Sequence, residues 1–276
     1  MLNLMYITNR PEIARIAENA GVDWIFVDME FIGKDARQKG LDTVQNHHTV
    51  EDVANIKKAV TKAKVLVRVN PIHDALSDYP SSKDEIDNTI KAGADIVMLP
   101  FFKTVDEVRK FLRYVDGRTK ICLLVETPEA ALLLDEILEL PGIDMIHLGL
   151  NDLHLALGMK FMFELLADGT VDRLAAKIKG KSIPFGFGGI ATLTGGAMPG
   201  AMVLKEHYRL GSSMVIVSRS FCNTDKIIDL DEVRKIFNKG IADIRRLEKE
   251  AAEAANYFAS NRNAVIGSVH DIITKI

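Results

Sequence analysis

Eight short β-rich runs, separated by helix-like stretches, recur along this chain of 276 residues. The runs are LMYIT (4–8), DWIFVDME (23–30), KVLVRVN (64–70), DIVMLP (95–100), KICLLVE (120–126), DMIHLGL (144–150), IPFGFGG (183–189) and SMVIVSR (213–219). Strict alternation predicts parallel strands joined by crossover helices, and eight such units predict an α/β fold, a closed (β/α)8 TIM barrel. An open doubly wound sheet is the alternative. Its Gly-rich turn is missing, because TNRPE follows the first run.

Helix boundaries agree with this alternation. Thr49, Thr104 and Thr127 stand at predicted helix starts, each followed two or three positions later by Asp or Glu, as N-caps and the helix dipole prefer. Gly21 and Gly93 fall where helices should stop, just before the next strand.

The chain reads as one domain over residues 1–276, because no low-complexity linker or composition break divides it. Residues from about 231 to 276 exceed one barrel helix and are predicted to form an extended C-terminal helix. Its apolar stripe comprises Val233, Ile236, Phe237, Ile241 and Ile244. The stripe predicts packing on the barrel or on a neighbouring subunit, whereas the Lys/Glu/Ala-rich half could be a solvated charged helix.

Composition excludes several classes of partner. A formal net charge of -3 provides no basic field for nucleic acid or an anionic membrane, which favours a small-molecule partner. The sequence contains no secretory signal and no run of about 18 apolar residues, so we expect a soluble, unprocessed protein without a membrane segment. Cys122 and Cys222 provide neither a disulfide framework nor zinc spacing, and a reduced, cytoplasmic setting fits.

Acidic residues end the second run, where a buried strand normally carries aliphatic side chains. Side chains alternate along a strand, so Phe26, Asp28 and Glu30 share one face. The opposite face is aliphatic and should meet the surrounding helices. Both carboxylates are therefore predicted to point into the barrel, where loops at the carboxyl ends of strands build active sites.

Other charged residues follow the third, fifth and sixth runs. Glu126 and Asp152 end neighbouring strands, and two close carboxylates repel unless a cation lies between them. A hard divalent ion, Mg²⁺ or Mn²⁺, would resolve that repulsion. The alternative is that Arg68 neutralises Glu126 in a buried ion pair and Asp152 caps the next helix.

The seventh and eighth runs contain a possible anion site. Gly188 and Gly189 would let backbone approach a ligand, and Arg219 at the end of the eighth strand would complement an anion. The substrate would then be phosphorylated or carry a second acid group. Alternatively, Gly186 and Gly188 relieve crowding inside the barrel.

An ordered set of motifs lies between residues 21 and 158: VDWIFVDMEF, VLVRVNP, ADIVMLP, LLVETPEA and PGIDMIHLGLNDLHLALG. With this set the chain resembles the HpcH/HpaI aldolase and citrate lyase β-subunit family. The resemblance implies a (β/α)8 barrel that forms or consumes the enolate of pyruvate or acetyl-CoA with a divalent metal. It also implies a homo-oligomer, from dimer to hexamer, in which a C-terminal helix can swap onto a neighbour.

The resemblance also implies roles for individual residues. Glu126 and Asp152 would be the metal ligands, and Arg68 would bind the C2 oxygen of a 2-oxo acid and stabilise its enolate. The turn from Gly149 through Asn151 to Asp152 would bind the substrate carboxylate. Glu30 and Asp28 would line the same site.

The chain departs from its relatives after the second strand. The small pyruvate aldolases have a His directly after the Glu, in a dyad with the Asp that matches Asp28, whereas this chain has Phe31. His47 or His48 could fold back as the base, with His48 weakly preferred, or both could merely precede the helix that starts at Thr49. The loop before them contains four polar residues that could bind an acidic substrate group: Lys34, Arg37, Gln38 and Lys39.

The leading hypothesis is therefore a divalent-metal-dependent aldolase. It would cleave a 4-hydroxy-2-oxo acid to pyruvate, or an analogue, and an aldehyde. A CoA-ester lyase of the citryl or malyl type and a non-catalytic barrel that binds an anionic metabolite are the alternatives.

Overall fold

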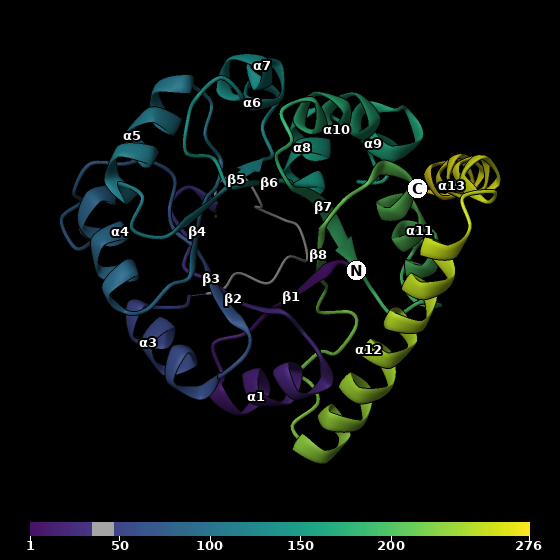
Figure 1. The fold of residues 1–276 in the computed structure, drawn as a ribbon, viewed down its shortest axis with the longest axis horizontal. Helices are drawn as coiled ribbons and strands as arrows, with labels where there is room; N and C mark the ends of the chain where they lie inside the picture. The colour runs from purple at the N-terminus through teal and green to yellow at the C-terminus, as the bar shows by residue number, and fades with distance from the viewer. Residues whose placement is uncertain (35–46) are drawn as a thin grey trace.

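Eight parallel strands close into a barrel surrounded by helices in the computed structural model, which describes residues 1–34 and 47–276 (Figure 1). The strands are β1 (Asn3–Ile7), β2 (Trp24–Asp28), β3 (Lys64–Arg68), β4 (Ile96–Leu99), β5 (Lys120–Val125), β6 (Met145–Leu148), β7 (Phe185–Ile190) and β8 (Met214–Val217). Each strand pairs with the next along the chain, and β1 pairs with β8. The predicted (β/α)8 barrel is confirmed, and the open sheet is wrong.

Most of the described helices lie between successive strands, and two follow β8. They are α1 (Pro11–Ala20), α3 (Val50–Ala59), α4 (Ser82–Lys91), α5 (Val105–Val115), α6 (Pro128–Leu132), α7 (Leu134–Ile137), α8 (Leu150–Ala156), α9 (Glu164–Ala167), α10 (Thr170–Gly180), α11 (Gly200–Leu210), α12 (Leu230–Glu253) and α13 (Phe258–Ile273). The single helix predicted after the fifth strand is divided at Leu133 into α6 and α7. In the described part of the chain, no helix is both long and apolar enough to span a membrane.

The predicted helix boundaries are confirmed. Thr49, Thr104 and Thr127 are the N-caps of α3, α5 and α6, and each side chain accepts a hydrogen bond from the backbone N–H three residues on. Gly21 ends α1 at φ 102° and Gly93 follows α4 at φ 104°, in the left-handed region that glycine adopts without strain.

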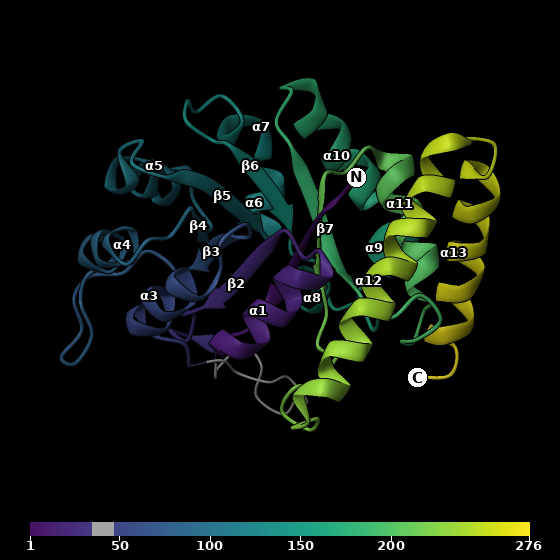
Figure 2. The ribbon, with the colours of Figure 1, turned by 60° about the horizontal axis from the view of Figure 1, so that its bottom comes forward.

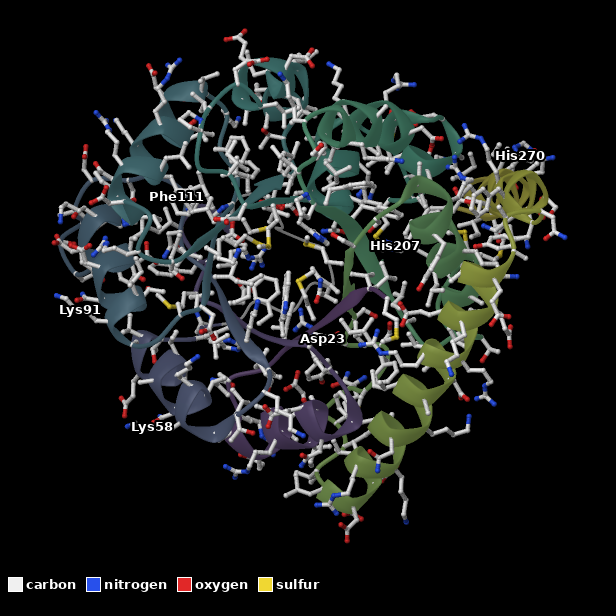
Figure 3. All side chains as sticks on the ribbon, in the orientation of Figure 1. Asp23, Lys58, Lys91, Phe111, His207 and His270 are labelled. Atoms are coloured by element: carbon white, nitrogen blue, oxygen red, sulfur yellow. The ribbon has the colours of Figure 1, made fainter. Side chains whose placement is uncertain are left out.

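Apolar side chains form two separate clusters. The cluster inside the barrel comprises Met5, Trp24, Phe26, Leu66, Ile96, Met98, Cys122, Leu124, Met145 and Met214. The alternate strand residues, including Ile25 and Val27, join the shell between the sheet and its helices. In that shell Phe111 of α5 is buried, whereas Lys58 and Lys91 lie at the rim (Figure 3). The predicted division of β2 into an inner and an outer face is therefore confirmed.

The C-terminal extension consists of two helices that pack on their own barrel (Figure 2). Along α12, Val233, Phe237 and Ile241 are buried against the barrel. Helix α13 packs against α11, where Asn261 Nδ2 donates to Glu206 Oε1 at 2.8 Å. Of the two predicted packing partners, the structure shows the barrel, and an oligomer remains a prediction.

The second half of α12 also holds the start of the chain. The buried carboxylate of Glu248 accepts hydrogen bonds from Leu2 N at 2.6 Å and from the Tyr208 hydroxyl at 3.0 Å. Arg245 donates to Leu2 O at 2.8 Å and to the Asp23 carboxylate at 2.6 Å. The Lys/Glu/Ala-rich half of α12 is therefore joined to the first strand and is not merely solvated.

Candidate active site

Asp28 and Arg68 form a bidentate ion pair at the ends of β2 and β3. They are register partners, and Arg68 Nε and Nη2 donate to the two Asp28 carboxylate oxygens at 2.8 Å each. The carboxylate is almost fully buried, at 1% exposure. A buried carboxylate is stable only when it is paired, and the fork geometry of Arg provides such a pair. The alternative pairing of Arg68 with Glu126 is wrong, because the ion pairs of Arg68 are with Asp28 and Glu30.

Among the described residues, Glu30 and Lys34 join Asp28 and Arg68 in a cluster of two carboxylates and two cations. Arg68 Nη1 lies 3.3 Å from Glu30 Oε2, and Lys34 Nζ lies 3.1 Å from Asp28 Oδ2 and 3.5 Å from Glu30 Oε2. Burial lowers the pKa of Arg68, but Asp28 and then Glu30 outweigh it, so the pKa lies well above its usual value. Arg68 is therefore a permanent positive charge at the barrel mouth. Residues 37–39, predicted with Lys34 to contact an acidic substrate group, lie outside the described residues.

Asn70, two residues beyond β3, holds the turn that follows β2. Its Oδ1 accepts from the backbone N–H groups of Phe31 and Ile32 at 2.9 Å each, and its Nδ2 donates to Glu85 Oε1 at 2.8 Å. The Tyr79 hydroxyl donates to the same Glu85 oxygen at 3.0 Å. Sequence reasoning missed this network. The polar residue directly after VRV and the Glu in the first turn of the next helix were its signals.

The aromatic ring of Phe31, at the position where the resemblance predicts a His, packs outside the charged cluster. It meets the Tyr79 ring edge-on, with the ring centroids 4.8 Å apart, and is 37% exposed. Phe31 and Tyr79 also line a cavity of about 380 Å³, together with His47 and His48. His47 is exposed there, and its predicted catalytic role remains a prediction.

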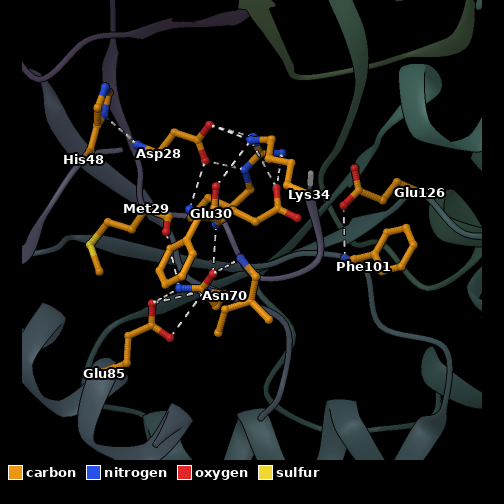
Figure 4. Close-up of polar contacts among 12 residues, drawn as sticks. Asp28, Met29, Glu30, Lys34, His48, Asn70, Glu85, Phe101 and Glu126 are labelled. Carbon is orange, nitrogen blue, oxygen red and sulfur yellow. Dashed lines mark hydrogen bonds and ion pairs between the residues drawn. The ribbon is translucent and has the colours of Figure 1, made fainter. Parts of the chain in front are cut away.

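His48 contacts Asp28 through the backbone. Its Nδ1 accepts a hydrogen bond from Asp28 N at 3.0 Å, on the side of Asp28 opposite Lys34 (Figure 4). Burial lowers the pKa of His48, and the nearby Asp28 charge only partly offsets this effect. The ring is then neutral, its lone pair at Nδ1 is engaged, and Nε2 carries the proton. To act as the predicted base, His48 Nδ1 would first have to lose its hydrogen bond from Asp28 N.

Glu126 ends β5 beside the start of α8. Its side chain is 4% exposed, and its Oε1 accepts from Phe101 N at 3.0 Å (Figure 4). A Cβ on Gly149 would lie 2.8 Å from Glu126 Oε2, so only glycine lets the turn after β6 pass this closely over the carboxylate. Asp152 lies in the first turn of α8, where Gly149 is the N-cap, so Asp152 does not cap the helix as the alternative proposed.

Glu126 and Asp152 fit a hard divalent ion, because they provide the carboxylate oxygens that such an ion prefers. The absence of a side chain at Gly149 also leaves space next to the Glu126 carboxylate. The described residues contain no group of three or more potential ligands for a metal. Mg²⁺ needs no such group, because it keeps several waters and is commonly held by one or two carboxylates together with substrate oxygens. Asn151 Nδ2 donates to Asp152 Oδ1 at 3.2 Å and so helps to orient that carboxylate.

The glycines of β7 are required by packing. A Cβ on Gly186 would lie 2.3 Å from Met214 O, and Gly188 has φ +50° against the side chain of Leu150. Gly189 lies close to β8 in the same way. These contacts favour the relief of crowding over ligand approach. Binding of an anion by Gly188, Gly189 and Arg219 remains a prediction.

His147 lies inside the barrel on β6 and makes stability depend on pH. It is 1% exposed, its Nε2 contacts Gly188 O at 3.1 Å, and burial lowers its pKa to about 4. Between about pH 6.5 and 4 the unfolded chain binds a proton that the native protein does not, so native stability falls as the pH falls. From pH 7 to 5 this group should cost about 2 kcal/mol.

The measurement is urea unfolding at pH 7 and pH 5 for the wild type and His147→Gln. Glutamine can still donate to Gly188 O but does not titrate. The variant should therefore lose about 2 kcal/mol less than the wild type over this interval. An equal loss in both proteins would show that His147 does not contribute.

Comparisons with known proteins agree with the barrel fold. The model of the HpcH/HpaI aldolase/citrate lyase family matches residues 3–164, which contain the strand ends described above as far as Asp152. Among solved structures, an HpcH/HpaI aldolase/citrate lyase family protein from Burkholderia cenocepacia J2315 has 17% identity and a TM-score of 0.60, covering 84% of this chain and 94% of its own. An HpcH/HpaI aldolase from Desulfitobacterium hafniense DCB-2 has 17% identity and a TM-score of 0.58, covering 88% and 93%. At such identity these structures share the fold, and no curated protein matches the sequence.

Proposed function

Because this chain belongs to the HpcH/HpaI aldolase/citrate lyase family of carbon–carbon lyases, we propose that it is a divalent-metal-dependent aldolase. Its substrate is a 4-hydroxy-2-oxo acid, which it cleaves through an enolate to pyruvate, or a close analogue, and an aldehyde. The protein acts in the cytoplasm as a homo-oligomer on this small-molecule substrate.

One observation carries the proposal: a partly buried, permanently charged guanidinium lies at the same barrel mouth as a buried carboxylate. Arg68 is held by Asp28 and Glu30, and the charge of Glu126 also acts on it. Three of the five N–H donors of Arg68 serve these carboxylates. The others can bind an oxygen on which negative charge develops, where preorganised donors contribute most.

The remaining residues divide the work of binding. Glu126 and Asp152 would hold Mg²⁺ or Mn²⁺, which as a Lewis acid would polarise the 2-oxo group. Arg68 binds and orients the C2 oxygen. The turn from Gly149 to Asp152 binds the substrate carboxylate. Arg219 serves a second acidic group of the substrate.

The test is exchange of the pyruvate methyl protons for deuterium in D₂O, followed by NMR with Mg²⁺, with Mn²⁺ and with chelator. It reports enolisation and does not require the aldehyde. Metal-dependent exchange is expected in the wild type and should fall about 100-fold in Glu126→Gln, since a bound metal contributes several kcal/mol. Glu129→Gln is the matched control, because this carboxylate pairs with Lys103 outside the cluster.

The other outcomes separate the alternatives. A folded protein that binds metal, as measured by calorimetry, but does not exchange pyruvate would point to a CoA ester or a different 2-oxo acid. A protein that binds neither metal nor pyruvate would be the non-catalytic barrel.

A further inference from the structure

Lys34 is a buried lysine that the chemistry above does not use. Its side chain is 6% exposed, and its Nζ contacts the carboxylates of Asp28 and Glu30, with the Glu30 carbonyl oxygen at 3.5 Å. Burying an ammonium group is costly unless it is paired and hydrogen-bonded. The three acceptors around Nζ match its three donors, so this position is specifically built.

The backbone turn after β2 directs Lys34 back over the strand end. Lys34 N donates to Phe31 O at 3.0 Å, and Gly33 has φ 74°, which residues other than glycine adopt only with strain. Asn70 holds the first N–H groups of the same turn. Two strand ends therefore fix where Nζ lies.

Cleavage of a 4-hydroxy-2-oxo acid requires a group that accepts the C4 hydroxyl proton. Arg68 cannot be deprotonated, and Nδ1 of His48 is engaged by Asp28 N. Phe31 has no titratable group. Asp28 and Glu30 are carboxylates, which are much weaker bases than an amine. Among the described residues of this cluster, Lys34 is the remaining base.

We propose that Lys34 takes the C4 hydroxyl proton during cleavage and returns it during aldol addition, an inference that rests on the proposed function. The neutral amine removes the proton, and the O–H electron pair forms the C4 carbonyl of the aldehyde. The C3–C4 bond breaks, its electrons form the C2–C3 double bond, and the C2 carbonyl pair moves to the oxygen that Arg68 binds. A proton then added at C3 gives the pyruvate methyl group, and the Lys34 ammonium releases its proton to solvent.

The charged groups around Lys34 allow this cycle. Asp28 faces it from the end of β2 and Glu30 from the turn that follows, and Arg68 faces the same carboxylates from β3. Further out, the charges of Lys34 and Arg219 both act on His48. Because Arg68 stays on both carboxylates at every pH, they remain paired when Lys34 is neutral. Proton loss from Lys34 leaves the carboxylates of Asp28 and Glu30 paired with one guanidinium, so these groups then carry a net negative charge.

The experiment compares Lys34→Met and Lys34→Arg with the wild type in two reactions. The first is deuterium exchange at the pyruvate methyl group. The second is addition of pyruvate to glyoxylate, glycolaldehyde or propanal, with cleavage of the isolated adducts. Exchange involves no C4 oxygen and should stay within about threefold in both variants, whereas addition and cleavage should fall by about 10²–10⁴-fold in both, as for loss of a general base.

Arginine distinguishes a proton carrier from a fixed charge, because it keeps the positive charge but cannot act as a base. Lys103→Met is the control for loss of an ordinary lysine, which here is about half exposed. Circular dichroism and urea midpoints establish that each variant is folded.

Four results would overturn the inference. Wild-type rates of addition and cleavage in Lys34→Arg would show that Lys34 contributes only its positive charge and does not act as a base. Equal losses of exchange and cleavage would make it a structural residue. If the wild type exchanges the methyl protons of pyruvate but adds pyruvate to none of the aldehydes, no product with a C4 hydroxyl group forms, and Lys34 has no such proton to transfer. A wild type without exchange would overturn the proposed function, and this inference with it.

Discussion

Replacing Arg68 by methionine should lower the rate of pyruvate methyl exchange by about 10³-fold, the upper range for loss of one preorganised donor to a developing oxyanion. The variant loses the permanent charge that faces the substrate oxygen. It also leaves the carboxylates of Asp28 and Glu30 without the guanidinium that pairs with both. Removing one partner of a buried pair costs about 3–5 kcal/mol, and Lys34 should keep the loss near the lower limit.

The measurement combines the NMR exchange rate with urea unfolding, so that lost activity is compared only among folded proteins. Arg68→Lys is the matched control. The lysine keeps a positive charge but cannot form two parallel hydrogen bonds to Asp28. This variant should therefore restore the free energy of unfolding more than it restores the exchange rate. Exchange at the wild-type rate in folded Arg68→Met would remove Arg68 from the mechanism.

Replacing Asn70 by alanine should lower the free energy of unfolding by about 3 kcal/mol, because two backbone N–H groups and a buried carboxylate lose a partner together. Burial raises the pKa of Glu85, more than its hydrogen bonds lower it, so loss of an Asn70 donor affects a carboxylate that is already poorly solvated. The turn that carries Lys34 would also lose its anchor. Urea unfolding measures the first effect, and the aldol cleavage rate measures the second.

Tyr79→Phe is the comparison for Asn70→Ala. It removes one donor to Glu85 and leaves the contacts from Asn70 to the turn intact, so about 1 kcal/mol is expected, with little change in cleavage. Equal losses in the two variants would show that Asn70 acts only through Glu85. An Asn70→Ala variant with wild-type stability and normal cleavage would show that the turn after β2 keeps its conformation without Asn70.

Much of the architecture was predictable from local patterns. Alternating runs and capping threonines placed the strands and helices, since each depends on a few neighbouring residues. The inward direction of Asp28 followed from the two-residue period of a strand. The same runs placed Glu126 and Arg68 at strand ends.

The partners of these side chains were not predictable. Arg68 could have reached Glu126 or Asp28, and only the barrel register, which makes Asp28 its direct neighbour, decides between them. Lys34 reads as one of several loop cations, because its burial depends on the turn conformation at Gly33 and on the distant Asn70. Packing between segments far apart in sequence determined both results.

The contacts of α12 with the first strand set the order in which the chain can mature during synthesis. β1 needs β8 as its second neighbour, and Leu2 needs the Glu248 carboxylate and the Arg245 guanidinium. A nascent chain on the ribosome that has released only seven strands has an unpaired edge on β1, the kind of edge that promotes aggregation. Translation through β8 must therefore precede closure of the barrel, and translation through α12 must precede the contacts of Leu2. Chaperones that bind exposed strand edges would act on this chain before the barrel closes.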